Sequence, residues 1–314
     1  MTNAYSTPHR WAVHPQPLPD ETLTSWLTRV ARANASTLSS WLATVYGSDT
    51  WPREQNLDTN PSPEFWGRIA ECTAITGGVA AVCAMSFAVL PERVASWLLT
   101  AGRAAKERRA RWCPRCLQAD AEPHFRRAWR WEWVAWCPRD GLRLHDACPG
   151  CGAVLNYQVV PWRRALTECW KCRADLTRAE PDATPAPEIV RTAASAALGH
   201  LTSLTPDDVD ALWCLQRFVR LVGWQRKDGT FVPPTFVAAD FPTYPAMSPG
   251  AIATSFALAW HLFTVGRTDL PTLVQQHQGS FNQAIQYRCP AWLRAFHRPV
   301  RRRLEPLTTA LITA

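Results

Sequence analysis

Two Cys-x-x-Cys pairs lie in the stretch CPGCGAVLNYQVVPWRRALTECWKC, which runs from residue 148 to residue 172. Two residues between cysteines close a tight turn that places both sulfurs at adjacent corners of a tetrahedron, and zinc takes four such ligands. Seventeen residues separate the two pairs, a spacing typical of structural zinc modules. We therefore predict a Cys₄ zinc site, with buried free cysteines or disulfides as the alternative; its ligands are Cys148, Cys151, Cys169 and Cys172.

A second set of cysteines precedes this stretch and has one ligand too few. Cys113-Pro-Arg-Cys116 is a full pair, whereas Cys137-Pro-Arg-Asp140 keeps the spacing but ends in a carboxylate. A carboxylate oxygen can ligate zinc. His145 is the alternative, because an imidazole is the better soft-metal donor. We favour Asp140 as the fourth ligand because spacing decides which side chain reaches the corner; a set without metal remains the alternative.

The N-terminal residues and the length of the apolar stretches indicate the compartment that we expect. Residues 1–8 lack the basic-then-apolar pattern of a signal peptide, and the longest apolar stretch, residues 77–90, is shorter than the ~20 residues that span a bilayer. We therefore expect a reducing, cytoplasmic setting without a membrane partner, in which cysteine pairs bind metal before they form disulfides. Four isolated cysteines are predicted to fill cores: Cys72, Cys83, Cys214 and Cys289.

The motifs argue against catalysis. A catalytic zinc keeps one position open for water, and a Cys₄ site has none. The chain contains neither His-Glu-x-x-His nor the deaminase pattern, and it has no Walker-type loop and no nucleophile elbow. A thioredoxin-like role is disfavoured because no pair follows a strand to open a helix. We predict two structural Zn²⁺ ions and no enzymatic activity; a zinc hydrolase is the competing hypothesis.

The composition is that of a folded protein with a modest excess of basic residues. The 314 residues are 47% hydrophobic and 19% charged, with seventeen tryptophans that we expect mostly in cores. The formal charge is +8. A modest basic excess suits a nucleic-acid partner without establishing one.

Helical patterns flank the cysteines. Asp20 offers an N-cap for an amphipathic helix that Asn34 ends, and Ser36 can cap a second helix that ends at Gly47. This pair of helices resembles a helix-turn-helix, although a plain helical hairpin would show the same pattern of apolar residues. Further helices are predicted to begin at Pro63, after Gly77, at Pro91, at Pro206, at Gly250 and at Leu270.

We expect a mainly α fold with a little β structure. The predicted segments are a helical, helix-turn-helix-like domain over 1–102, tandem zinc modules over 103–178, a linker over 179–188 and a helical domain over 189–314. Short strands are expected where tryptophans alternate, at Trp129, Trp131 and Trp133.

The stretch from residue 103 to residue 143 is basic, with eleven Lys or Arg against five acids. Arginine presents a planar fork of donors that suits phosphates. For residues 126, 127 and 130 the alternative is a solvated face or an internal pair with Glu122 or Glu132, and for residues 106, 108, 109 and 111 it is plain solvation of a helix. The candidate nucleic-acid or partner contacts are Lys106, Arg108, Arg109, Arg111, Arg126, Arg127 and Arg130.

Two signatures in order resemble the TniQ family of transposon target-selection proteins. The first is Pro15-Gln-Pro-Leu-Pro-Asp-Glu-Thr-Leu-Thr-Ser-Trp-Leu-Thr-Arg-Val-Ala31. The second comprises Cys113-Pro-x-Cys116-Leu117, Phe125-Arg126-Arg127-x-Trp129, Cys137-x-x-Asp140-Gly141-x-x-Leu144, Cys148-Pro149-x-Cys151-Gly152 and Leu155. The family pattern usually has His where this chain has Asp140. The resemblance covers about residues 15–172.

The resemblance implies an accessory factor and not a transposase. Such proteins link a target-recognising element to an AAA+ ATPase regulator, which recruits the transposase. The target element is a DNA attachment site for some and an RNA-guided CRISPR effector complex for others, sometimes bound by a dimer. The competing hypothesis is a zinc-stabilised protein–protein scaffold without intrinsic DNA binding.

Overall fold

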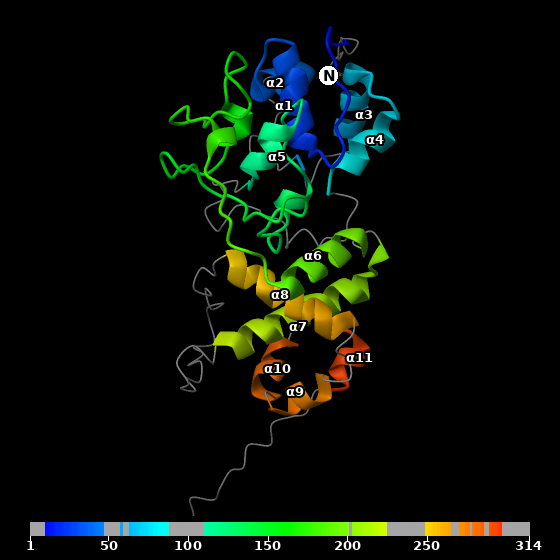
Figure 1. The fold of residues 1–314 in the computed structure, drawn as a ribbon. Helices are drawn as coiled ribbons and strands as arrows, with labels where there is room; N and C mark the ends of the chain where they lie inside the picture. Colours follow the sequence, from blue (N-terminus) through cyan, green and yellow to red (C-terminus); the bar gives the residue numbers. More distant parts are fainter. Residues whose placement is uncertain are drawn as a thin grey trace, which may run out of the picture. The chain divides into compact units, whose positions relative to one another are not determined.

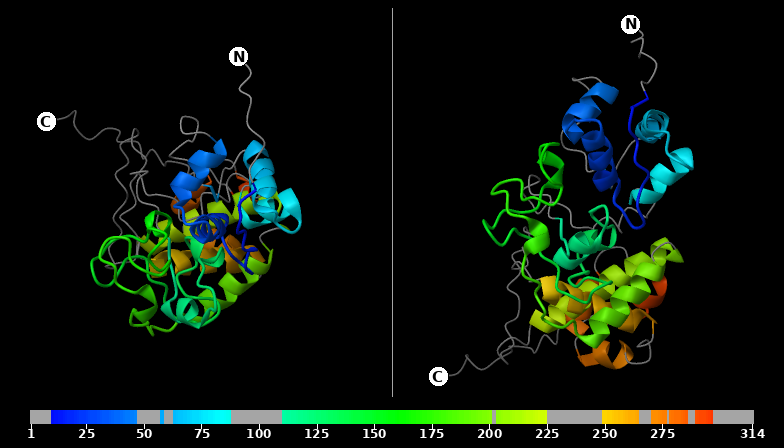
Figure 2. Two further views of the ribbon diagram at one scale, coloured as in Figure 1. Left: turned by 90° about the horizontal axis from the view of Figure 1, so that it is seen from above. Right: turned by 45° about the horizontal axis from the view of Figure 1, so that its top comes forward.

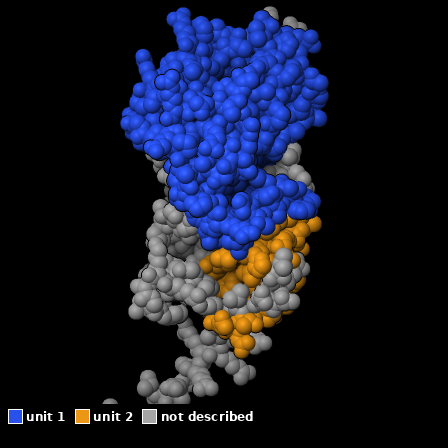
Figure 3. Space-filling model, viewed as in Figure 1, with its two compact units in different colours: residues 1–203, 244–257 blue, residues 204–243, 258–314 orange. Residues whose placement is uncertain are grey.

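The computed structural model describes residues 10–46, 57–58, 63–87, 110–200, 203–224, 249–264, 270–276, 278–285 and 289–296. The described chain is mostly helical, as predicted, and its only β structure is a set of isolated bridges (Figure 1). It forms two compact units (Figure 3). Unit 1 comprises residues 1–203 with 244–257, and unit 2 comprises 204–243 with 258–314.

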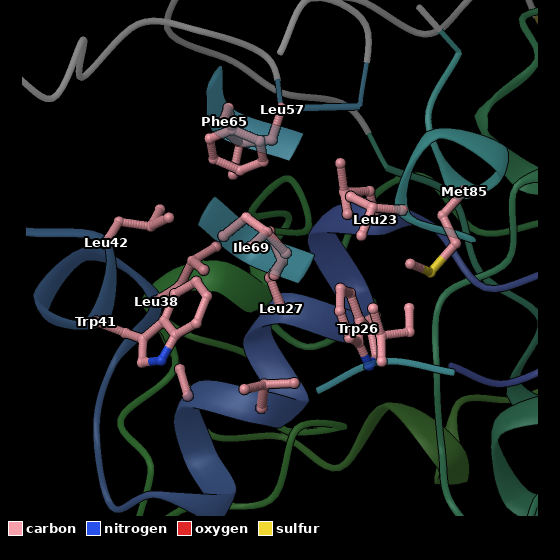
Figure 4. Close-up of a cluster of buried hydrophobic side chains, with 14 residues drawn as sticks. Leu23, Trp26, Leu27, Leu38, Trp41, Leu42, Leu57, Phe65, Ile69 and Met85 are labelled. Carbon is pink, nitrogen blue, oxygen red and sulfur yellow. The ribbon is translucent and has the colours of Figure 1, made fainter. Parts of the chain in front are cut away.

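Four helices of unit 1 surround one apolar core. They are α1 (Leu23–Ala33), α2 (Leu38–Tyr46), α3 (Pro63–Thr73) and α4 (Gly78–Met85). Trp26 and Leu27 of α1 meet Trp41 of α2 and Ile69 of α3 in this core, and all four side chains are fully buried (Figure 4). The apolar stripe predicted from i, i+3, i+4 spacing is therefore the face that packs.

The first two helices begin one or two residues later than predicted. Thr22, not Asp20, caps α1, because its hydroxyl accepts the Ser25 N–H at 3.1 Å. Asp20 has a positive φ of 60°, and its carbonyl accepts the N–H of Arg127 at 2.7 Å. Likewise the hydroxyl of Thr37, not Ser36, accepts the Ser40 N–H at 3.2 Å at the start of α2. The C-cap at Asn34 is confirmed, whereas Gly47 lies outside the described residues.

The cysteine-bearing part of unit 1 consists of short helical turns joined by loops. The turns are α5 (Pro114–Ala119), η2 (Ala128–Arg130), η3 (Tyr157–Val159) and η4 (Leu176–Arg178). The predicted strands at the tryptophans are wrong: Trp129 lies in η2, whose N–H groups bond three residues back. The alternation still buries Trp131 and Trp133, whose rings stack at 5.6 Å. Figure 2 shows the later loops of the cysteine-bearing part (green) beside α1 and α2. Among them, η3 packs against both helices.

The remaining helices are α6 (Glu188–His200), α7 (Pro206–Trp224), α8 (Pro249–Thr264), α9 (Leu270–Gln276), α10 (Gln278–Ala284) and α11 (Ala291–Arg294). The predicted starts at 206, 250 and 270 hold to within one residue. Thr205 caps α7, where its hydroxyl accepts the N–H of Asp208 at 3.2 Å. Phe218 of α7 meets Phe281 of α10 edge to face in unit 2. The helix predicted from Pro91 lies outside the described residues.

Unit 1 contains both the N-terminal helices and the cysteine region. The expected linker is also tied to that region: Arg143 N–H donates to the carbonyl of Asp182 at 3.0 Å, and the indole of Trp136 donates to the carbonyl of Thr184. The predicted domain boundaries at residues 102, 178 and 188 therefore remain predictions.

No single helix in the described ranges has the length and apolar character to cross a bilayer. Glu64–Thr73 and Gly78–Met85 satisfy both criteria only when taken together, and the pair is bent by 115°.

Candidate metal centres

The structure brings Cys113, Cys116, Cys137 and Asp140 together as a four-ligand cluster, with all ligand atoms within 4.8 Å of one another. The carboxylate Oδ2 of Asp140 lies 3.2, 2.8 and 3.8 Å from the three sulfurs in turn, and Cys116 Sγ is 3.6 Å from Cys137 Sγ. A tetrahedron with zinc–ligand bonds of about 2.1–2.3 Å has edges of about 3.4–3.8 Å. The distances from Cys137 Sγ to Cys116 Sγ and to Asp140 Oδ2 fall in this range, and those from Asp140 Oδ2 to the other two sulfurs are shorter. The cluster has the donor set of a zinc site.

His145 does not join this cluster. Its ring stacks on Trp112 at 5.3 Å, and its backbone pairs with the same residue in an antiparallel bridge. That pairing holds the imidazole away from the cysteines. Of the two candidates for the fourth ligand, the structure thus places Asp140 and not His145 beside the sulfurs.

The second cluster consists of the four cysteines predicted as the Cys₄ site, Cys148, Cys151, Cys169 and Cys172. Its cross-pair sulfur distances are 3.6 Å between Cys148 and Cys172 and 3.7 Å between Cys151 and Cys169. Both distances match the edge of a zinc–thiolate tetrahedron.

Three of the four ligand turns share one backbone design. The N–H of Cys137, Cys148 or Cys169 donates to the carbonyl five residues on, and its own carbonyl accepts the N–H four residues on. We call these turns knuckles. The position four residues after the first cysteine has a positive φ of 67–68° in each, and it is occupied by Gly141, Gly152 or Arg173.

The fourth ligand turn is helical. Cys113 is the N-cap residue of α5, Pro114 occupies its first turn, and Cys116 lies one turn on. Proline is favoured there because the first helical N–H needs no intrahelical partner. The first cluster thus joins a helix to a knuckle, whereas the second joins two knuckles.

The two clusters differ in burial. The three sulfur-bearing residues of the first cluster are at most 2% exposed. In the second, Cys148 and Cys169 are buried, Cys151 is half-buried and Cys172 is exposed. The first cluster lies in the interior of unit 1 and the second at its periphery.

Thiol protons compete with a cation in both clusters. Hydrogen bonds to Cys113 and Cys137, together with burial, raise the pKa of Cys116 above its usual range, while its neighbours lower the pKa of Cys137 to about 2. Burial raises the pKa of Cys148 to about 12. A bound cation must displace the protons of the high-pKa thiols, so metal affinity falls as the pH is lowered.

The predicted basic contacts are largely internal in the structure. Arg111 is 4% exposed and donates to the carbonyls of Glu132 and Val134. Arg126 forms a bidentate pair with Asp120 at 2.8 and 2.9 Å. These contacts favour a structural role for both side chains.

The last two arginines of that set behave similarly. Arg130 is 4% exposed and lies 3.3 Å from the Asp58 carboxylate. Burial lowers the pKa of Arg127, whose guanidinium lies over the ring of Phe87 at 5.2 Å. Lys106, Arg108 and Arg109 lie outside the described residues.

Residues of α1 hold the segment that follows the first cysteine pair. The N–H of Thr22 donates to the carbonyl of Phe125 at 3.0 Å, and the N–H of Phe125 donates to the Ser25 hydroxyl at 3.0 Å. The guanidinium of Arg29 joins the buried Glu21 at 2.7 Å and also pairs with Glu122. These polar residues of the N-terminal signature therefore fasten α1 to the metal-binding region.

The sequence did not predict these contacts between α1 and the metal-binding region. The available signal was a set of polar residues at positions 21 and 22, just before α1, and at positions 25 and 29 within it. Polar side chains buried on a packing face need partners, and here the partners lie about 100 residues away.

These features define a class: a mainly helical protein with two four-ligand clusters that could hold metal ions. The family model described as TniQ matches residues 12–144, so this part of the chain is similar to the TniQ family. A search of the curated proteins gives no match. Proteins of this family have a transposition-associated role in target selection. The match includes the whole first cluster and ends before the second.

The knuckle geometry predicts opposite effects for two substitutions. Gly152→Ala should destabilise the zinc-loaded protein by about 1 kcal/mol, because an L-residue is strained at positive φ. No atom lies within 4 Å of the added Cβ, so the backbone alone sets the cost. Arg173→Gly should stabilise by a similar amount, and equilibrium urea unfolding checks both.

Gly199 in α6 is a matched control. It also has open space around its Cβ position but has no positive φ. Gly199→Ala should therefore be neutral or stabilising. Equal destabilisation by Gly152→Ala and Gly199→Ala would contradict the role given to the positive φ.

Proposed function

We propose that the protein is an accessory target-selection adaptor in DNA transposition, which links target DNA or an RNA-guided effector complex to an AAA+ ATPase regulator of the transposase. The observation that carries the proposal is the TniQ match over 12–144, which spans both α1 and the first cysteine cluster. We place this activity in the cytoplasm, where thiols stay reduced. A homodimer is compatible with the proposal.

Two structural Zn²⁺ ions per chain are part of this proposal. Zinc fits both donor sets, and it would serve to hold loops that have few core residues of their own. The first ion would sit on Cys113, Cys116, Cys137 and Asp140, and the second on Cys148, Cys151, Cys169 and Cys172. Neither set leaves a position for a reacting water, which supports a scaffold over a hydrolase.

Metal analysis of three proteins tests the ligand assignment. The wild type should bind two zinc ions, Asp140→Cys should also bind two, and Asp140→Ala should retain close to one. His145→Ala is the matched control and should keep both ions, because its imidazole stacks on Trp112. Loss of an ion in His145→Ala but not in Asp140→Ala would reverse the assignment.

The partner proposal is tested by capture of an AAA+ transposition ATPase on the zinc-loaded protein. Wild type and Asp140→Cys should both retain it, because each keeps the metal-bound fold. A hydrolase would instead lose activity in Asp140→Cys. Failure of fully zinc-loaded protein to retain the ATPase would contradict the adaptor role.

A scaffold without intrinsic DNA binding is the second candidate. It is favoured by the burial and internal pairing of Arg111, Arg126 and Arg130. A salt titration separates the two, since DNA binding through Z phosphates weakens with log[salt] at a slope near −0.9Z. No duplex binding at ~50 mM salt would favour the scaffold.

A further inference from the structure

Two exposed tryptophans lie close together in the sequence of unit 1, beside the second cluster. Among the described residues, seven large apolar side chains are exposed, and three of them lie within twelve residues of sequence: Val159, Trp162 and Trp170. The two tryptophans are 39% and 41% exposed. Indoles are costly to leave in water, so two on one small module point to a surface that meets a partner.

These tryptophans belong to the second cluster and to the loop that packs on it. Trp170 lies inside the knuckle Cys169–Cys172, and its indole N–H donates to the carbonyl of Val154 at 2.9 Å. The loop of residues 161–168 is tied to the same knuckle, because the Arg164 guanidinium donates to the carbonyl of Cys169 at 2.7 Å. Metal binding would therefore hold the knuckle that carries Trp170, to which the loop that carries Trp162 is bonded.

Cations are interleaved with the indoles. The guanidinium of Arg163 lies 5.0 Å from the ring centre of Trp162. Lys171 follows Trp170 directly, and Arg173 is the third residue after it. All three cations are exposed. The single acid of residues 161–173, Glu168, is already paired with Arg164 at 2.8 Å. No ion pair joins the three exposed cations to a carboxylate in the part of the chain that the structure describes.

The position of Arg173 supports a functional role for the exposed positive charge beside the second cluster. The two other knuckles have glycine at the equivalent position of positive φ, where any L-residue is strained. Arginine at φ 67° gives up backbone stability and gains an exposed guanidinium beside the cluster. The competing explanation is that Arg173 offsets the negative charge that four thiolates leave on a zinc centre.

We infer that Trp162, Arg163, Trp170, Lys171 and Arg173 form a binding surface for single-stranded nucleic acid. Indoles stack on unpaired bases, whose faces a duplex hides, and interleaved cations contact the phosphates. A duplex would use only the cations. The inference rests on the proposed function for the zinc that closes the knuckle, and it adds a partner and a surface.

The test is fluorescence anisotropy of the full-length, zinc-loaded protein with labelled oligo-dT and oligo-U of about 15 nucleotides, beside a duplex of equal length. Single strands should bind more tightly than the duplex at ~50 mM salt. Trp162→Ala should weaken single-strand binding about 5-fold or more, since each base–aromatic stack contributes about 1–3 kcal/mol. Arg173→Gly should weaken it and reduce the salt slope by about 0.7.

Arg178→Ala is the matched control. It removes one exposed cation from the same module, but that cation is paired with Asp175 at 3.4 Å, so the salt slope should not change. Zinc content and near-ultraviolet circular dichroism of each variant show whether it is folded. Loss of zinc from the wild type in mild chelator would count against the proposed function and not against this surface.

Three results would overturn the inference. One is absence of single-strand binding by zinc-loaded wild type. Another is duplex binding as tight as single-strand binding that Trp162→Ala leaves unchanged. The third is loss of zinc from Arg173→Gly, which would show that Arg173 compensates the charge of the metal centre.

Discussion

Cys116→Ser should release the metal of the first cluster and should strongly destabilise the core around that cluster. Cys116 is 1% exposed, and its sulfur lies within 3.6 Å of both Cys137 Sγ and Asp140 Oδ2. Zinc contributes about 10–16 kcal/mol to small structural sites, as much as the whole stability of a typical domain. Loss of the near-ultraviolet signal of the buried tryptophans, together with zinc analysis, measures the effect.

Cys172→Ser in the peripheral cluster should be milder. Cys172 is exposed and lies outside the TniQ match, so the core of α1 and α2 should persist while the second zinc is lost. Cys83→Ser is the control, because Cys83 belongs to neither cluster and should leave both zinc ions in place. Equal damage from Cys116→Ser and Cys172→Ser would show that burial does not rank the two clusters.

Asp58→Ala should destabilise the protein by about 3–5 kcal/mol, the second large effect. Asp58 is fully buried, and its Oδ1 accepts the N–H and the hydroxyl of Thr24 at 2.8 and 2.7 Å. Its other oxygen faces the buried guanidinium of Arg130. Removing the carboxylate leaves a buried cation without its counter-charge. Urea unfolding of zinc-loaded protein measures the loss.

A double variant isolates the cause of that loss. Asp58→Ala with Arg130→Met removes both charges, so it should be more stable than Asp58→Ala alone. Arg178→Ala breaks an exposed pair with Asp175 and should cost under about 1 kcal/mol. A double variant no more stable than Asp58→Ala alone would show that the Thr24 hydrogen bonds, and not the ion pair, set the loss.

Spacing along the chain determined the ligand clusters and most helix starts. Two residues between cysteines allow one turn, so four Cys-x-x-Cys or Cys-x-x-Asp elements predict two clusters, and the structure forms both. Pro63 and Pro206 open α3 and α7 because proline's fixed φ and missing N–H suit only the first turn. These are local effects of covalent geometry, which a sequence displays directly.

Tertiary structure decided which polar groups meet. Asp140 rather than His145 reaches the first cluster because the backbone bridge between Trp112 and His145 holds the imidazole aside. Arg126 and Arg130, expected as partner contacts, are paired with Asp120 and Asp58 instead. Polar contacts in this fold join residues as far apart as Ser25 and Phe125, which are 100 positions apart, and their distances depend on the packing of the whole core, which no local pattern encodes.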